Sequence, residues 1–278
     1  MNRNLIKDTK NILSCRQIKP FKALGQNFLI DKTVLKKIIQ SASLKLSDIV
    51  LEIGPGTGIL TRELAKKAKK IIAVEKDKKM AEILKNNLND FQNIKIINAD
   101  ILKLKNLKLP KDYKVAANLP YYIASPVIRK FLELKTPPKL MVLMVQKEVG
   151  QRICAKPPRM NLLAVSVQFY GKPEIIDYVP KKSFWPQPKI DSAIIKITPY
   201  NKYKKETDSK LFFRIVKAGF SQPRKQISNN LEAVLKLNKK EIMLWLSAQK
   251  IKPSQRAESL SVAEWRLLTK NLPIDAPM

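Results

Sequence analysis

The sequence of 278 residues contains no histidine and only two cysteines, Cys15 and Cys154. Without histidine, catalysis of the Ser-His-Asp or Cys-His type and metal sites with histidine ligands are excluded. Two cysteines so far apart in the sequence are too few for a cysteine metal site, and we expect both to be reduced thiols. Any chemistry therefore proceeds without imidazole or thiolate, and no metal site is predicted.

Long apolar runs are also missing. The longest, such as Leu140 to Val145, are much shorter than the roughly 20 residues needed to cross a bilayer. Residues 1–11 are polar and charged, without the apolar stretch of a signal peptide. Apolar residues still make up 45% of the chain, which is enough for a buried core. These features predict a folded cytoplasmic protein that does not enter a membrane.

Acidic residues are scarce relative to basic ones. Lys and Arg number 54 against 23 Asp and Glu, which gives a formal net charge of +31. Such an excess favours a polyanionic partner, because each cation that neutralises a phosphate releases a condensed counterion. No stretch pairs a strong apolar face with a basic one, as a membrane-surface helix requires. We therefore expect nucleic acid or the ribosome as partner.

From residue 49 to about residue 198, short apolar runs alternate with amphipathic stretches. The runs predicted to be buried strands are Ile49–Ile53, Ile71–Val74, Ile94–Ile97, Val115–Ala117 and Leu140–Val145. Between them apolar residues recur at helical spacing. Alternating strands and helices predict an α/β fold, with a parallel sheet covered by helices on both faces. Asp31 is predicted to cap the start of a leading helix.

The strand signals stop near Pro199. A stretch rich in Lys and polar residues follows at 200–208, and we interpret it as a basic linker. Four helical patterns come after it: Ser209–Phe220, Arg224–Leu237, Lys239–Gln249 and Ser261–Lys270. The chain is therefore expected to consist of a basic N-terminal arm at 1–20, an α/β domain at 21–204 and a small all-α domain at 205–278.

A glycine-rich turn follows the first predicted strand, in the sequence Leu51-Glu52-Ile53-Gly54-Pro55-Gly56-Thr57-Gly58. Glycines there permit a tight turn and let the backbone approach a ligand closely at the start of the next helix. The pattern is G-x-G-x-G preceded by an acid, whereas a dinucleotide-binding dehydrogenase has G-x-G-x-x-G. A tight turn without a ligand is the alternative. We assign Gly54, Gly56 and Gly58 to a cofactor site.

Acidic residues end the next two predicted strands. Glu75 follows Gly56 by 19 residues, and a carboxylate at that place is suited to accept hydrogen bonds from ribose hydroxyls. Asp100 ends the third strand, where it can accept from an adenine amine. Either acid alone could be a solvated strand end. Together with the glycine turn they resemble the binding sequence of a Rossmann-type class I methyltransferase that uses S-adenosylmethionine, with Lys76 and Ile101 in the same site.

The sequence Asn118-Leu119-Pro120-Tyr121 follows the fourth predicted strand. It resembles the N/D-P-P-Y/F signature of methyltransferases that act on exocyclic amines of nucleobases. Adenine N6 is a poor nucleophile because its lone pair is delocalised into the ring. The Asn118 side-chain oxygen and the Leu119 carbonyl can both accept from this amine, so that positioning and electrostatics supply the catalysis. Tyr121 is expected to stack on an extruded base, whereas an ordinary turn is the alternative.

Two further segments make the resemblance specific. Residues 22–29, Lys-Ala-Leu-Gly-Gln-Asn-Phe-Leu, look like the G-Q-N-F-L motif of the ribosomal RNA adenine dimethyltransferase family. Residues 184–193, Phe-Trp-Pro-Gln-Pro-Lys-Ile-Asp-Ser-Ala, look like its F-x-P-x-P-x-V-D-S-A motif. Segments 221–225 and 256–261 also resemble positions in the family's C-terminal domain. The resemblance thus extends from about residue 20 to about residue 270.

The resemblance implies roles for residues in both motifs and a monomeric enzyme. Gln26, Asn27 and Leu29 would help to enclose the cofactor, which Asn118 also contacts. Phe184 would stack on the face of the target base opposite Tyr121, although Phe184 could also be an ordinary core aromatic.

The sequence departs from the family pattern at two places, and it carries an extra segment at its start. The loop 156–162 replaces one that usually contains Gly and Tyr, and Pro223 stands where Arg is common. These differences concern RNA contacts rather than methyl transfer. Residues 1–20, with Asp8 as their single acid, are expected to form an extra basic arm that contacts RNA.

The family contains two branches with different substrates. One methylates two neighbouring adenines in a hairpin loop near the 3′ end of small-subunit rRNA, and the other methylates one adenine of large-subunit rRNA and confers antibiotic resistance. The resistance branch tends to carry N-I-P-Y and an Asn at the position of Asp191. Leu119 and Asp191 therefore favour the small-subunit branch, with an immature small ribosomal subunit as partner. A loop target also suits the chemistry, because unpaired bases are easier to extrude.

Two alternatives from other classes remain open at this point. A non-catalytic ribosome assembly factor would bind RNA even after loss of Gly54, Glu75 or Asn118, and this role can coexist with catalysis. A dehydrogenase is disfavoured because its glycine fingerprint and a histidine acid or base are missing.

Overall fold

The computed structural model describes residues 5–14, 26–104, 107–200 and 208–273. They form two compact units, one from the described residues of 1–150 and 173–199 and the other from those of 151–172 and 200–278. The sequence-based division at residue 205 therefore differs from the structure at 151–172, which groups with the C-terminal helices. Cys15 and most of the proposed basic linker lie outside the described residues.

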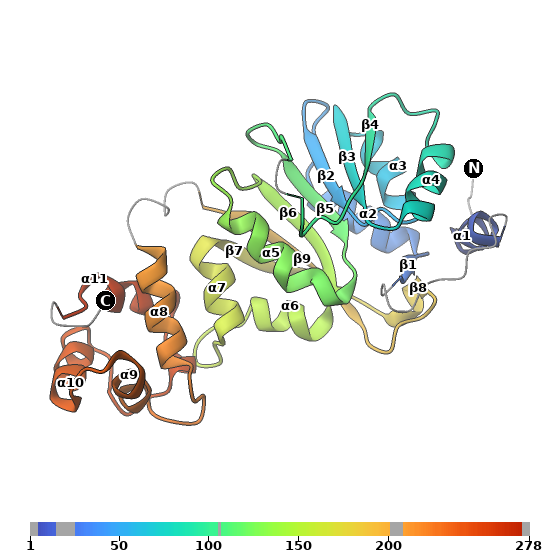
Figure 1. Cartoon of the computed structure of the whole chain (residues 1–278). Helices are drawn as coiled ribbons and strands as arrows, with labels where there is room; N and C mark the ends of the chain where they lie inside the picture. Colours follow the sequence, from blue (N-terminus) through green and yellow to red (C-terminus); the bar gives the residue numbers. More distant parts are fainter. Residues whose placement is uncertain (1–4, 15–25, 105–106, 201–207, 274–278) are drawn as a thin grey trace. The chain divides into compact units, whose positions relative to one another are not determined.

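The first unit is built on a seven-stranded sheet with the order β4-β3-β2-β5-β6-β9-β7 (Figure 1). Its strands are β2 (Ile49–Ile53), β3 (Lys70–Glu75), β4 (Ile94–Asn98), β5 (Lys114–Asn118), β6 (Leu140–Gln146), β7 (Gly171–Val179) and β9 (Ser192–Pro199). All five predicted strands are present, each within a residue or two of its predicted ends. Their β-branched and other apolar side chains are buried in the centre of the sheet, as expected where helices cover both faces.

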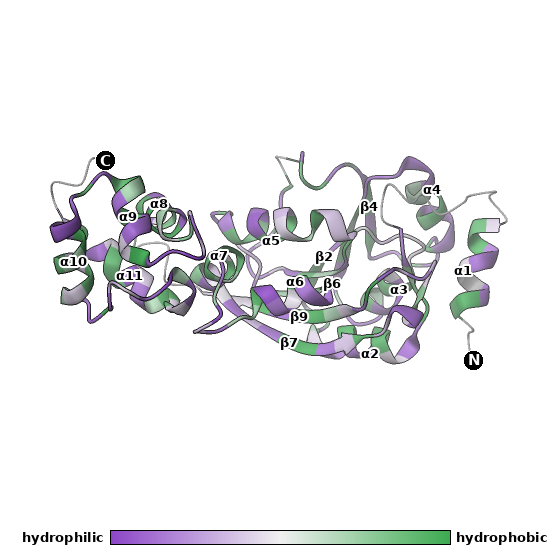
Figure 2. Ribbon diagram, turned by 90° about the horizontal axis from the view of Figure 1, so that it is seen from below, coloured by the Kyte–Doolittle hydropathy of each residue, from purple (hydrophilic) through white to green (hydrophobic). Residues whose placement is uncertain are grey.

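The helices of this unit alternate with the strands. They are α2 (Lys32–Ser41), α3 (Ile59–Ala65), α4 (Lys78–Asn87), α5 (Ala124–Glu133) and α6 (Lys147–Ile153), of which the last three residues belong to the second unit. Helices α2 and α3 lie on one face of the sheet and α5 on the other (Figures 1 and 2). Asp31 caps α2 as predicted, since its side chain accepts hydrogen bonds from the Thr33 and Val34 N–H groups. Figure 2 shows green hydrophobic and purple hydrophilic segments within single helices, in keeping with one buried face each.

The sheet is mixed rather than parallel throughout. Strands β2, β3, β4, β5 and β6 pair in parallel, but β9 runs antiparallel to β6, with Met141 opposite Ile197 and Gln146 opposite Ser192. The five predicted strands are therefore parallel as expected, and the antiparallel β9 at this edge was not predicted. In the described part of the chain no crossover helix leads into β9, and only a crossover connection returns a chain parallel to its neighbour.

Two short strands join segments that are far apart in the sequence. In a separate two-stranded sheet, β1 (Phe28–Leu29) pairs antiparallel with β8 (Phe184–Trp185), so that Phe28 lies opposite Trp185 and Leu29 opposite Phe184. The two family-like motifs are therefore neighbours in space, which spacing in the sequence could not predict.

The proposed basic N-terminal arm is partly a packed helix. Helix α1 (Leu5–Ser14) buries Leu13 in a small cluster with Phe28, Met80 and Ile83. Lys10 lies over the ring of Trp185, with its Nζ 5.6 Å from the ring centroid. The arm thus has an apolar, inward-facing side in addition to its cations, and the rest of residues 1–20 lies outside the described residues.

The second unit is helical. It consists of α7 (Leu162–Tyr170), α8 (Ser209–Gly219), α9 (Ile227–Leu235), α10 (Lys239–Ala248) and α11 (Val262–Lys270). Its core centres on the fully buried Trp265 and Phe212, and Phe169 from α7 stacks on Phe212 with ring centroids 4.1 Å apart. This packing explains why α7 belongs with the C-terminal helices. Among the helices of the described residues, none is long and apolar enough to span a membrane.

Candidate functional site

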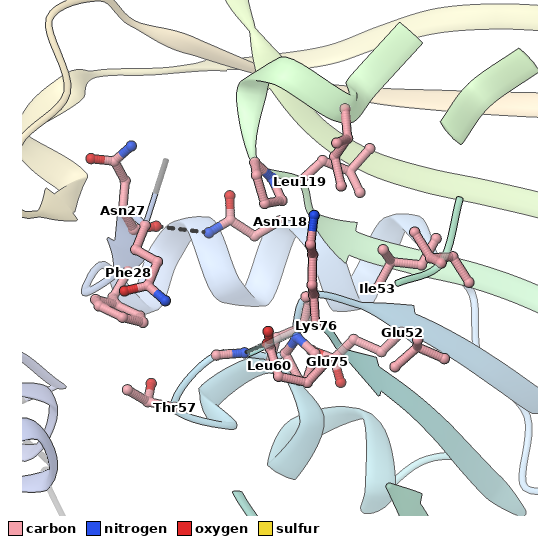
Figure 3. A pocket seen from close by; sticks show the side chains of 18 of the residues that line it. Asn27, Phe28, Glu52, Ile53, Thr57, Leu60, Glu75, Lys76, Asn118 and Leu119 are labelled. Atoms are coloured by element: carbon pink, nitrogen blue, oxygen red, sulfur yellow. Dashed lines mark hydrogen bonds between the residues drawn. The ribbon is translucent and has the colours of Figure 1, made fainter. Parts of the chain in front are cut away.

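A cavity lies at the carboxyl ends of β2, β3, β4 and β5, where open α/β sheets bind ligands (Figure 3). The residues that line it come from the turns after these strands and from the segment around β1. They are Gln26, Asn27, Phe28, Leu29, Glu52, Ile53, Gly54, Pro55, Gly56, Thr57, Ile59, Leu60, Val74, Glu75, Lys76, Ala99, Asp100, Ile101, Leu102, Asn118, Leu119, Pro120, Tyr121, Tyr122 and Ile123.

The glycine turn is held against β3 and Phe28. The Gly56 N–H donates to Glu75 Oε2 at 3.2 Å, and Gly56 has a φ of +57°, which favours glycine. A Cβ on Gly56 would also lie 3.1 Å from the Phe28 ring, closer than ordinary contact. The backbone therefore passes close to the aromatic wall of the cavity, and a larger residue would displace that wall.

Glu75 is 8% exposed and is held by backbone N–H groups on both carboxylate oxygens. Besides the bond from Gly56, its Oε1 accepts from the Asp77 N–H at 2.9 Å. Burial raises the pKa of Glu75, and the N–H groups of Asp77 and Gly56 act in the opposite direction. Its carboxylate is thus fixed in one orientation at the wall of the cavity.

Asp100 and Lys76 form an ion pair at the ends of β4 and β3, with Lys76 Nζ 3.1 Å from Asp100 Oδ2. The Leu102 N–H also donates to Asp100 Oδ1 at 2.9 Å. Burial acts to raise the pKa of Asp100, but the Leu102 N–H and the Lys76 ammonium outweigh it and lower the pKa. The Asp100 carboxylate is therefore ionised at neutral pH and can accept hydrogen bonds from a ligand.

Asn118 ends β5, and its side chain points toward β1 (Figure 3). Its Nδ2 donates to the Asn27 carbonyl at 3.1 Å, which leaves Oδ1 as the acceptor end of the amide. The Leu119 N–H donates to the Met144 carbonyl at 3.2 Å and so ties the turn to β6. The orientation of the Asn118 amide is therefore set by the G-Q-N-F-L segment.

Tyr121 follows the same turn and is anchored by its hydroxyl. Tyr121 Oη and Ser192 Oγ lie 3.0 Å apart, and Ser192 is fully buried at the start of β9. Burial raises the pKa of Tyr121, with Asp191 adding to the rise and Ser192 opposing it. Its phenol is therefore neutral near pH 7 and serves as a hydrogen-bonding anchor for the ring.

The structure brings most of the predicted site residues to one cavity. Of the residues assigned from the sequence, Gly58 and Phe184 do not line it. Gly58 has a φ of +84°, and a Cβ there would lie 2.7 Å from Leu84, so it permits the packing of α3 on α4. Phe184 is 3% exposed and packs in the core that contains Leu29.

The cavity also contains residues that the sequence analysis did not assign. Glu52 and Phe28 were present in the motifs but received no role, and Tyr122 and Ile123 follow the N-L-P-Y sequence directly. Their places beside assigned residues could have found them, and for Glu52 so could its position as the acid that precedes the glycine pattern. Glu52 is the most unusual of them, because it is a carboxyl group that is 1% exposed.

The hydrogen-bond acceptors and the apolar side chains of the cavity fit S-adenosylmethionine. Carboxylates at Glu75 and Asp100 suit hydroxyl and amine donors, while Phe28, Leu29 and Ile101 offer apolar contact for a flat ring. The sheet order, the glycine turn and the strand-end acids together define a Rossmann-type class I methyltransferase that depends on S-adenosylmethionine.

Comparison with known proteins then identifies the family. The sequence model of the family described as "Ribosomal RNA adenine dimethylase" matches residues 19–272, and the chain belongs to this family. A relative from Dehalococcoides mccartyi, named "Ribosomal RNA small subunit methyltransferase A", is 42% identical over 95% of this chain and 92% of its own. A relative of the same name from Alkaliphilus metalliredigens is 41% identical over 95% of this chain and 96% of its own.

Solved structures agree with this assignment. A dimethyladenosine transferase from Plasmodium falciparum matches with a TM-score of 0.75 and 29% identity, over 87% of this chain and 95% of that one. The 23S rRNA methyltransferase ErmE matches with a TM-score of 0.74 and 26% identity, over 88% of this chain and 99% of that one. The protein is thus an enzyme of the rRNA adenine dimethyltransferase type.

Proposed function

We propose that the protein dimethylates N6 of two adjacent adenines in the 3′-terminal hairpin loop of small-subunit rRNA during ribosome biogenesis. The names of relatives at about 40% identity support the small subunit as target. The N-L-P-Y sequence and Asp191 support the same branch. Asp191 accepts a hydrogen bond from the Lys181 N–H at 3.0 Å, so its carboxylate holds the turn that carries the F-x-P-x-P motif.

The orientation of Asn118 is the observation that carries the proposal. Because its Nδ2 is bound to the Asn27 carbonyl, Oδ1 is the group left to accept a hydrogen bond from the target N6 amine. The Leu119 carbonyl accepts a hydrogen bond from the second N6 hydrogen, and Pro120 restricts the turn that presents this carbonyl. Two acceptors favour a pyramidal nitrogen, with the lone pair directed at the methyl group. S-adenosylmethionine would supply that methyl on a sulfonium, whose S–C bond breaks as the N–C bond forms. The methylated amine is acidic enough to lose its extra proton to solvent, so no histidine is needed.

The remaining cavity residues bind and orient the cofactor in this proposal. Glu75 accepts from the ribose hydroxyls, and Asp100 accepts from the adenine amine beside Ile101. The Lys76 ammonium pairs with the Asp100 carboxylate and keeps it ionised. Gln26, Asn27 and Leu29 close the cavity from the β1 side, and Gly54 and Gly56 let the backbone come close to the ligand.

Tyr121 stacks on the extruded adenine in this proposal, because the target atom is inaccessible while the base remains stacked in RNA. Phe184 on the opposite face stays a prediction, and its buried position means that its side chain has to move before it can stack. A monomeric, cytoplasmic enzyme that acts on an immature small subunit completes the proposal. The net charge of +31 supports an RNA substrate.

The test is methyl transfer from labelled S-adenosylmethionine to unmethylated small and large ribosomal subunits, with the modified nucleotides identified by mass spectrometry. Dimethyladenosine in the small subunit alone is the expected result. Label in the large subunit would instead assign the resistance branch, and label in neither, combined with tight subunit binding, would favour an assembly factor.

Asn118→Ala should abolish methyl transfer while RNA binding persists, because the variant loses one acceptor for the amine but no basic residue. Asn86→Ala is the matched control, since Asn86 is exposed on α4 and does not line the cavity. Turnover of Asn118→Ala equal to that of the control would contradict the proposed role.

A further inference from the structure

Glu52 is a buried carboxyl group at the wall of the cavity, and the proposed mechanism does not use it. It lies at the end of β2, two residues before Gly54, and is 1% exposed. Its Oε2 has no hydrogen-bond partner among the described residues. A buried oxygen without a partner costs free energy, so its retention in the wall of a binding site points to a partner supplied by the ligand.

The surroundings of Glu52 provide no cation within the described part of the chain. Its sheet neighbours are Ala73 on β3 and Ala116 on β5. The Thr61 side chain on α3 favours the ionised form, but its hydroxyl makes no hydrogen bond of standard geometry. Glu75, the other carboxylate at this wall, repels a charge on Glu52.

The other charged groups that line the cavity do not compensate Glu52. Lys76 is paired with Asp100, and the described ion pairs include none to Glu52. Burial, reinforced by Glu75, raises the pKa of Glu52 to about 8. The carboxyl group is therefore mostly protonated at neutral pH.

We propose that Glu52 is a proton-exchanging positioning residue of the cofactor site, neutral in the free enzyme and ionised when a positive group of S-adenosylmethionine lies beside it. This inference rests on the proposed use of the cavity as the cofactor site. The cofactor carries two positive groups, its sulfonium and its amino-acid ammonium. Either can stabilise a carboxylate in a low-dielectric wall, where an unpaired charge is unfavourable.

The step conserves atoms and charge. The Glu52 O–H bond breaks, its proton passes to the solvent buffer, and the carboxylate left behind is balanced by the positive group of the ligand. No other bond changes. Cofactor affinity should therefore rise with pH below pH 8, by up to about tenfold per pH unit, because one proton leaves per ligand bound. After methyl transfer the sulfonium charge is gone, so a carboxylate that responds to the sulfonium would regain its proton.

The experiment is calorimetric titration of the full-length enzyme with S-adenosylmethionine near pH 7, without RNA, in buffers of different ionisation enthalpy. The wild type should release close to one more proton per cofactor than Glu52→Gln. The cofactor's own amino group is already mostly protonated near pH 7, so any change in its protonation adds little to the difference between the two proteins. Equal proton release by the two proteins would overturn the proposal.

Ligands with different charges identify the responsible group. S-adenosylhomocysteine retains the ammonium but not the sulfonium, and 5′-methylthioadenosine has neither. Release with both charged compounds assigns the ammonium, and release with S-adenosylmethionine alone assigns the sulfonium. The same Glu52-dependent release with 5′-methylthioadenosine would refute the proposal, because filling the cavity without a charge would then suffice.

A matched variant and a spectroscopic measurement complete the design. Glu63→Gln removes a carboxylate on α3 that pairs with Lys66 and does not line the cavity, so its proton release should equal that of the wild type. In infrared difference spectra, the wild type should lose a protonated carboxyl band on cofactor addition, and this result does not depend on any variant folding. Absence of that loss would overturn the proposal. Because no RNA is present, neither result depends on which rRNA is methylated.

Discussion

At the residue scale, two carboxyl groups on neighbouring strands have opposite environments. Glu75 ends β3 and accepts hydrogen bonds from the N–H groups of Gly56 and Asp77. Glu52 is the second-to-last residue of β2, and its Oε2 has no partner among the described residues. One glutamate therefore has hydrogen bonds to both carboxylate oxygens, whereas the other has a buried carboxyl oxygen without a partner. This difference comes from the local backbone and not from the residue type.

The buried acid predicts a pH dependence of stability. Glu52 stays protonated in the folded protein up to a pKa of about 8, whereas it ionises near pH 4.5 in the unfolded chain. Between these values the folded state binds more protons, so this group lowers the free energy of unfolding as pH rises, by up to about 1.4 kcal/mol per pH unit. Glu52→Gln should remove this part of the slope.

Urea unfolding of the wild type and Glu52→Gln between pH 5 and pH 8 measures the effect. The variant should gain stability relative to the wild type as pH increases, and Glu63→Gln should not. A constant difference across this range would show that Glu52 has the same charge in the folded and unfolded states.

The hydrogen bond between Tyr121 and Ser192 predicts a positioning effect. Tyr121→Phe and Ser192→Ala should each lower the rate of methyl transfer by about 3- to 10-fold, the equivalent of one hydrogen bond, because the ring loses its anchor. Cofactor affinity should change little. The measurement is single-turnover methylation with calorimetry alongside, and Tyr178→Phe, on the exposed part of β7, is the control. Additive effects in the double variant would contradict a shared role.

At the scale of elements, the cavity forms where the carboxyl ends of β2, β3, β4 and β5 meet the short antiparallel pair of β1 and β8. Strands β2 to β6 were predicted because each is a short apolar run, and the capping of α2 because Asp31 precedes it, whereas β7 and β9 were not predicted. Strands β1 and β8 have only two residues each, which is too short for a periodic pattern to predict them from the sequence. Helix α7 looks the same in sequence whichever unit it joins, and only its contacts with Phe212 decide this.

Two glycines of the same turn should respond differently to substitution. Gly58→Ala should lower the free energy of unfolding by about 1–3 kcal/mol, since its φ is positive and its Cβ would overlap Leu84. Gly54→Ala has comparable backbone strain, but its Cβ meets Pro120 at an ordinary 3.5 Å, and it lines the cavity. We expect the larger loss of stability from Gly58→Ala and the larger loss of cofactor affinity from Gly54→Ala.

Chemical denaturation and calorimetric titration of both glycine variants separate the two effects. A larger loss of cofactor affinity in Gly58→Ala than in Gly54→Ala would contradict this expectation. It would support the assignment of Gly58 to the cofactor site that was made from the sequence pattern.

At the scale of the whole molecule, the charge imbalance predicts strongly salt-dependent RNA binding. With 54 basic and 23 acidic residues, several phosphates should be neutralised in the complex. RNA affinity should fall by at least about tenfold between 50 and 200 mM salt because of counterion release. Filter binding across this range measures the slope, with cofactor affinity as the control. A flat dependence would contradict the electrostatic argument.

The sequence by itself determined the α/β class, the cofactor motif, the N-L-P-Y turn and the family resemblance. These features depend on local order along the chain: apolar runs form strands, glycines permit turns, and polar residues at strand ends meet at one edge of a sheet. For the same reason the sequence alone sufficed to assign Gly54, Glu75, Asp100 and Asn118 to one site.

The tertiary structure alone decided what depends on contacts between distant segments. It showed that the Asn27 carbonyl orients Asn118, that Ser192 anchors Tyr121, and that Phe184 is buried while Gly58 packs against α4. It also revealed Glu52, whose Oε2 has no partner in the described part of the chain. Burial and hydrogen-bond satisfaction are properties of a side chain's surroundings, and those surroundings come from residues tens of positions away in the chain.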